Sequence, residues 1–93
     1  MKKYMIPKRF DTVTAEDIQE KILGIIDAND SPDLTLDFSE SEYVSSAGLR
    51  VVILIAKKMK AENRELILRN MPEAIYNIFK MAGFHLILNI QND

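Results

Sequence analysis

The segment Asp37-Phe-Ser-Glu-Ser-Glu-Tyr-Val-Ser-Ser-Ala-Gly-Leu49 decides how the fold of this chain is predicted. It overlaps the alternating run Leu34-Thr-Leu-Asp-Phe38, whose pattern is typical of a core strand. It then reaches Ser46, and serine often caps a helix because its hydroxyl accepts a hydrogen bond from a free backbone N–H. We therefore expect a strand, a polar connection and a helix capped by Ser46.

The segments on either side alternate between strand and helix. Isoleucines after Thr14-Ala-Glu-Asp17 recur at helical spacing, and Thr14 and Asp17 resemble a capping box. Residues 49–60 contain a β-branched run, but the lysines near their end favour a helix. The expected order is strand 3–8, a helix after Thr14 with Ile18, Ile22, Ile25 and Ile26 on its buried face, strand 34–38, helix 49–60, strand 65–69, a helix from Pro72 to Gly83, and strand 85–90.

This β-α-β-α-β-α-β order predicts one α/β domain over residues 1–93. Its small, mostly parallel sheet would pack against helices through right-handed crossovers. The length of 93 residues suits a single domain with one core.

The composition argues against several classes of function. A net charge of −2 gives no basic field for nucleic acid. The chain has no cysteine, so disulfides and thiolate metal sites are excluded. The longest apolar run, residues 51–56, is far shorter than the roughly 20 residues that span a bilayer. We therefore expect no membrane insertion and a cytoplasmic location.

Catalytic and cofactor motifs are not found in the sequence. Ser46 is not in a Gly-x-Ser-x-Gly elbow, no phosphate-binding loop is present, and His85 falls in a predicted strand, where a structural role is expected. The acidic residues Asp37, Glu40 and Glu42 have no His or Cys partners for a metal. Asp37 could accept a phosphoryl group, but a strand-end aspartate more often bonds the next turn. We expect no enzyme activity, cofactor or metal.

Ser46 on its own is most simply a helix cap, and its replacement by alanine would then cost about 1 kcal/mol. The ordered motifs add a second interpretation. Asp37-Phe-Ser39, the apolar Tyr43 and Val44, and Ser46-Ala-Gly-Leu49 resemble the signature of the STAS domain of bacterial anti-sigma factor antagonists. Arg9-Phe-Asp11 is similar to the segment that precedes the first helix of that family.

The resemblance implies a regulatory binding protein in bacterial transcription. An anti-sigma factor with serine kinase activity would bind this chain and phosphorylate Ser46, and a phosphatase would reset it. ATP would bind to that partner and not to this chain. The resemblance implies a contact surface around the serine, made of Asp11, Ser39, Ser45, Ser46, Ala47, Gly48, Leu49 and Arg50. Ala47 and Gly48 would let the partner approach the backbone closely.

Departures from the family pattern leave alternatives. Ser45 stands where the family has aspartate, and Ala47 stands where it has a hydroxyl residue, so Ser45 is the second choice for the phosphoacceptor. The same departures allow a non-phosphorylated scaffold subunit of a transporter or signalling complex. A nucleotide sensor is a third alternative. The chain begins at what resembles the second strand of the family, which would leave a sheet edge open for a weak homodimer.

Overall fold

A four-stranded parallel sheet lies at the centre of the protein. The computed structural model describes residues 2–28 and 31–91. The strand order is β1-β3-β5-β6, and every pair is parallel. The elements are β1 (Lys2–Met5), β2 (Arg9–Phe10), α1 (Ala15–Ala28), β3 (Asp33–Asp37), β4 (Tyr43–Val44), α2 (Ser46–Ala61), β5 (Glu65–Arg69), α3 (Glu73–Met81), the 3-10 helix η1 (Phe84–Leu86) and β6 (Asn89–Gln91).

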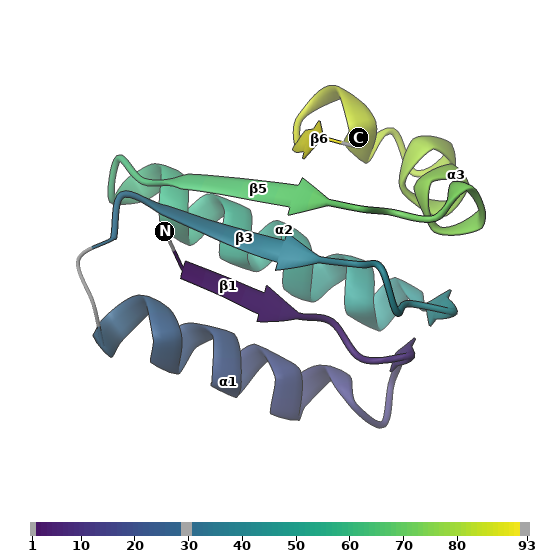
Figure 1. The fold of residues 1–93 in the computed structure, drawn as a ribbon, viewed down its shortest axis with the longest axis horizontal. Coiled ribbons are helices and arrows are strands. Elements are labelled where there is room, and N and C mark those ends of the chain that lie inside the picture. Colours follow the sequence, from purple (N-terminus) through teal and green to yellow (C-terminus); the bar gives the residue numbers. More distant parts are fainter. Residues whose placement is uncertain (1, 29–30, 92–93) are drawn as a thin grey trace.

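The helices occupy two places around this sheet (Figure 1). The long helices α1 and α2 contact each other, and α2 also contacts β5. The short helix α3 lies beyond the carboxyl end of β5. The strand order follows the order along the chain, so each crossover moves to the next strand. This arrangement confirms the predicted α/β domain with a mostly parallel sheet.

One apolar core joins the sheet to the helices. The predicted stripe of α1 is buried at Ile18, Ile22 and Ile26, whereas Ile25 is half-buried. In α3, Phe79 is fully buried and meets Phe38 edge to face, with ring centroids 5.7 Å apart. The remaining members of the core come from all layers and include Leu34, Leu36, Val51, Val52, Ile55, Met59, Leu66, Leu68 and Ile75.

Two helices are followed by a residue in the left-handed region of the backbone. Asn63 follows α2 with a φ of +57°, and Gly83 follows α3 with a φ of +79°, both in the left-handed region. The predicted turn after α1 includes Asn29 and Asp30, which lie outside the described residues.

The predicted strand 85–90 is wrong in its first half. His85 and Leu86 belong to η1, and β6 begins only at Asn89. Leu86 is 79% exposed and therefore does not share a buried face with Leu88. The left-handed Gly83 sends the chain into a 3-10 turn before it can pair with β5.

The open edge expected at the start of the chain falls on β1. Within residues 2–28 and 31–91, β1 pairs with β3 on one side alone. Lys2 and Lys3 are exposed on this strand. Charged side chains of this kind discourage pairing between sheet edges.

Candidate functional site

A second, two-stranded ladder holds the start of α2. Arg9 and Phe10 of β2 pair in parallel with Tyr43 and Val44 of β4. The next residue, Ser45, donates its backbone N–H to the carbonyl of Phe10 at 2.9 Å. Because β4 leads directly into α2, this ladder fixes where the helix begins.

Ser45, not Ser46, caps α2, so the predicted cap is wrong by one residue. Ser45 has the extended φ and ψ of a cap, −89° and 175°. Its hydroxyl accepts a hydrogen bond from the backbone N–H of Gly48 at 3.4 Å, and its carbonyl accepts one from Leu49 at 2.9 Å. The hydroxyl of Ser45 is therefore already in use by the fold.

Ser46 is the first residue of α2 and its side chain is exposed. No protein group within the described part of the chain hydrogen bonds to its hydroxyl. Because Ser46 begins α2, it lies at the positive end of the helix dipole, where an anionic group is favoured.

Gly48 has an internal reason to be glycine. It is buried, and a Cβ atom at this position would lie 2.6 Å from the carbonyl oxygen of Phe10 and 3.0 Å from its ring. The missing side chain makes room for Phe10, so packing inside the fold is enough to require glycine at this position. Leu49 is half-buried and packs against the core, whereas Arg50 is exposed.

Asp11 organises the turn that leads into α1. Its Oδ1 accepts hydrogen bonds from the backbone N–H groups of Val13 at 3.0 Å and Thr14 at 3.2 Å, and its Oδ2 accepts one from Arg9 Nε at 3.0 Å. The Arg9 hydrogen bond is the main reason that the pKa of Asp11 lies below its usual value. The predicted capping box is not formed, because Asp17 pairs with Lys21 instead.

Asp37 and Ser39 lie at the end of β3. The backbone N–H of Ser39 donates to Asp37 Oδ1 at 2.8 Å, and Lys3 Nζ and Asn70 Nδ2 contact Oδ2 at 3.1 and 3.3 Å. Burial alone would raise the pKa of Asp37, but these hydrogen bonds lower it to about 2. Asp37 therefore bonds the next turn, and Ser39 is exposed beside it.

A groove between the first halves of α1 and α2 adds residues that sequence reasoning missed. It has a volume of about 380 Å³ and is lined by Thr12, Ala15, Glu16, Gln19, Ala47, Arg50, Val51 and Leu54. Leu54, which lines the groove, is 42% exposed. The sequence carries no local signal for the groove, because its members come together only when the two helices pack.

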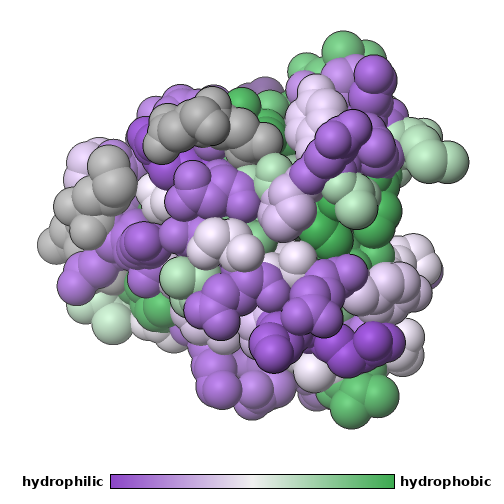
Figure 2. Space-filling view, turned by 45° about the vertical axis from the view of Figure 1, so that its right-hand side comes forward, coloured by the Kyte–Doolittle hydropathy of each residue, from purple (hydrophilic) through white to green (hydrophobic). Residues whose placement is uncertain are grey.

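Arg9 and Tyr43 were also missed as neighbours of the site. They are partners in the β2–β4 ladder, and the Arg9 guanidinium lies 5.0 Å from the centre of the Tyr43 ring. Figure 2 turns this end of the sheet toward the viewer and shows mostly hydrophilic surface with a hydrophobic area in its right half. A mixed face of this kind suits contact with a protein partner.

Among the residues that the structure describes, no group of three or more His, Cys, Asp or Glu side chains could hold a metal ion. None of the described helices is long and apolar enough to cross a membrane.

The chain belongs to the STAS domain family, because the model of that family matches residues 2–93. The family fold seen in anti-sigma factor antagonists is a regulatory and non-enzymatic one.

Two relatives carry the name anti-sigma factor antagonist. BtrV of Bordetella bronchiseptica is 30% identical over 82 residues, which are 88% of this chain and 70% of BtrV. The anti-sigma-B factor antagonist of Listeria monocytogenes is 27% identical over 82 residues, 88% of this chain and 71% of that protein.

Solved structures show the same fold. SpoIIAA, an anti-sigma factor antagonist in its unphosphorylated form, superposes with a TM-score of 0.83 at 18% identity, over 98% of this chain and 77% of SpoIIAA. A Thermotoga maritima protein assigned to the same class superposes with a TM-score of 0.85 at 16% identity, over 98% of this chain and 79% of that one. These structures show the fold, and the role of an anti-sigma factor antagonist is supported by the named relatives.

Proposed function

We propose that this chain is a cytoplasmic anti-sigma factor antagonist that binds an anti-sigma factor with serine kinase activity and is switched off by phosphorylation of Ser46. The observation that carries this proposal is an exposed serine at the first position of α2, whose hydroxyl has no hydrogen-bond partner among the described residues. The partner supplies ATP and the catalytic groups, so this chain is a substrate and not an enzyme.

The proposed contact surface surrounds Ser46. It consists of the groove between α1 and α2, the exposed Arg50, and the β2–β4 end with Tyr43, which is 42% exposed. We also assign Asp11 and Ser39, in the turns after β2 and β3, to this surface, and Ala47 lines the groove directly. Gly48 and Leu49 support it from inside.

The switch has a physical basis at the start of the helix. The Ser46 oxygen forms a bond to the γ-phosphorus of ATP, the bond to the β-phosphate oxygen breaks, and ADP leaves while the hydroxyl proton passes to a base of the kinase. The product carries about −1.5 to −2 charges at pH 7. The helix dipole favours such a charge by about 0.3–1 kcal/mol, so the fold tolerates it. Arg50, four residues further along α2, is placed to pair with the phosphate.

The same charge acts against the complex. A partner that covers Ala47, Leu54 and Tyr43 would have to remove water from a phosphate at Ser46, and this desolvation costs more than an ion pair with Arg50 returns. Hydrolysis by a phosphatase replaces the phosphate with the hydroxyl and restores binding. One modification thus changes the docking surface without changing the fold.

Incubation with the cognate kinase and ATP tests this function. Mass spectrometry should place a single phosphate on Ser46, and Ser46→Ala should abolish the modification. Ser45→Ala is the matched control and should still be phosphorylated, because the capping hydroxyl is turned toward the N–H of Gly48. Phosphate on Ser45 alone would move the switch to the neighbouring residue, and no phosphate on either serine would favour the scaffold alternative.

A further inference from the structure

A second pocket lies at the other end of α2, away from the serine. It has a volume of about 430 Å³, within the range of about 300–1,000 Å³ that is usual for small-molecule sites. Its nearest part begins at Ile53, seven residues after Ser46, which is roughly 10 Å along the helix. The pocket and the groove between α1 and α2 share no lining residue, although Ile53 and Leu54 are neighbours on α2.

The floor and the far wall of this pocket are apolar. Leu66 of β5 is buried beneath it, and Ile53 and Ala56 of α2 are half-buried along one side. Ile87 and Leu88 form the opposite side, and Ile87 is 68% exposed. A large apolar side chain so exposed beside a pocket offers contact area for the body of an apolar ligand.

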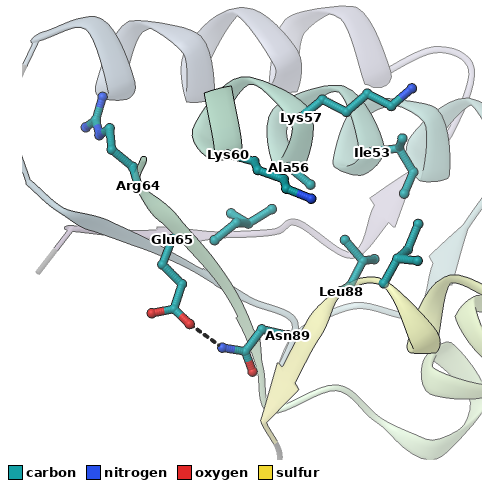
Figure 3. Close-up of a pocket in the computed structure, with 10 residues that line it drawn as sticks. Ile53, Ala56, Lys57, Lys60, Arg64, Glu65, Leu88 and Asn89 are labelled. Carbon is teal, nitrogen blue, oxygen red and sulfur yellow. Dashed lines mark hydrogen bonds between the residues drawn. The ribbon is translucent and has the colours of Figure 1, made fainter. Parts of the chain in front are cut away.

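Two lysines form the charged part of the rim. Figure 3 shows the Lys60 side chain lying across the space between α2 and β6, with its ammonium group toward the pocket, and Lys57 on the same helix. No acidic group in the described part of the chain lies within 4.0 Å of either ammonium group. Lys58, between them, differs because it contacts Asp27 at 3.4 Å and Glu62 at 2.9 Å.

The other charged groups of the rim are held by the protein. Arg64 donates to the carbonyl oxygens of Ser31 at 2.9 Å and Ile26 at 3.1 Å, and it contacts Glu62. Glu65 accepts a hydrogen bond from Asn89 Nδ2 at 2.7 Å, which ties β5 to β6 (Figure 3). Glu65 keeps its negative charge, because its partner Asn89 is neutral, but the cations of the rim outnumber it, so the rim has an excess of positive charge.

The position on the helix selects among anions. Phosphate groups favour helix N-termini, where free N–H groups point outward. This pocket lies beside the later turns of α2, where the negative end of the helix dipole disfavours a multiply charged phosphate more than a singly charged carboxylate, and Lys57 and Lys60 supply positive charge. A single carboxylate on an apolar body fits this arrangement better than a nucleotide phosphate does.

We infer that this pocket binds an amphipathic carboxylate, such as a medium-length acyl anion, with the apolar chain on Leu66, Ile87 and Leu88 and the carboxylate near Lys60. The inference does not depend on the proposed phosphorylation, because no residue that lines this pocket belongs to the proposed contact surface.

Titration with decanoate, followed by the methyl NMR signals, tests the inference. Saturable shifts are expected at the methyl groups of Ile53, Leu66, Ile87 and Leu88, below the concentration at which decanoate forms micelles. Decyltrimethylammonium, with the same chain and the opposite charge, should bind more weakly. Equal binding of the two probes, shifts at Leu54 in the other groove, or shifts that do not saturate would overturn the inference.

Three variants sharpen the test. Lys60→Gln should weaken decanoate binding about two- to fivefold, as expected for an exposed ion pair, and leave decanol binding unchanged. Lys80→Gln is the matched control, because Lys80 is likewise an exposed lysine in the last turn of a helix, and it should leave decanoate binding intact. Ala56→Phe should fill the pocket and block both ligands. Unchanged decanoate affinity in Lys60→Gln would contradict the role of the lysine.

Discussion

Replacement of Gly48 by alanine tests how tightly the start of α2 is packed. In most helix positions this change is stabilising by about 1 kcal/mol, because glycine has the greater conformational freedom to lose. Here the new Cβ would lie 2.6 Å from the carbonyl oxygen of Phe10, a backbone atom that cannot rotate away. Forcing a methyl group into a packed site costs about 1–3 kcal/mol.

The clash less the gain in helix propensity leaves a loss of up to about 2 kcal/mol in the free energy of unfolding, and we expect Gly48→Ala near this upper end because the clash is with a backbone atom. For a domain of this size each kcal/mol lowers the Tm by about 4–8 °C. Urea and thermal unfolding, followed by circular dichroism, would measure both quantities.

Gly24→Ala is the matched control. Gly24 lies in α1, and a Cβ atom there meets nothing within 4 Å. This variant should gain about 0.5–1 kcal/mol from helix propensity alone. The reasoning is refuted if Gly48→Ala is as stable as the parent protein, or if both variants change stability in the same direction by the same amount.

Three further predictions concern the supporting residues. The pKa of Asp37 falls from its ordinary 3.8 to about 2 in the folded protein, so its carboxylate stabilises the fold fully above about pH 4 and progressively less as the pH falls through 2. Asp37→Asn should therefore lower the free energy of unfolding by about 2 kcal/mol at pH 7 and flatten its pH dependence between pH 2 and 4, as measured by urea unfolding. Parallel pH profiles of the variant and the parent protein would contradict this. Ser45→Ala should lower the free energy of unfolding by up to about 1 kcal/mol in chemical denaturation, because it removes the helix cap. Ser46→Ala should change it by less than about 0.5 kcal/mol, and the reverse order would show that the cap is misassigned. Phe79→Ala should lower the free energy of unfolding by about 3–5 kcal/mol, because it removes the ring that packs against Phe38 and leaves a cavity. Met81→Ala, at an exposed position, should change it by less than about 0.5 kcal/mol. Similar calorimetric Tm values for the two variants would argue against a packed core at Phe79.

The sequence was informative where the pattern is local. The isoleucine stripe of α1 and the alternation in β3 follow from helical and strand periodicity, and both appear as predicted. The strands β2 and β4 were missed because each has two residues and exists only through its pairing with the other. A ladder between positions 9–10 and 43–44 has no local periodicity to reveal it.

The site was predicted less completely than the fold, for two physical reasons. Either of two adjacent serines satisfies the residue preference of a helix cap, and the ladder through Phe10 decides that Ser45 takes the role. The glycine after Ala47 indicated close approach of some group, but not whether that group is a partner or Phe10 itself. The groove residues of α1 come from the packing of two helices, which no single segment encodes.

Affinity for the kinase-type anti-sigma factor, compared between unphosphorylated and fully phosphorylated protein, tests the central claim most directly. Isothermal titration should show tight binding of the unphosphorylated form and a loss of at least tenfold after phosphorylation of Ser46, with an unchanged circular dichroism spectrum and Tm. Equal affinities of the two forms, or a phosphorylated protein that has unfolded, would contradict a switch that acts on the docking surface alone.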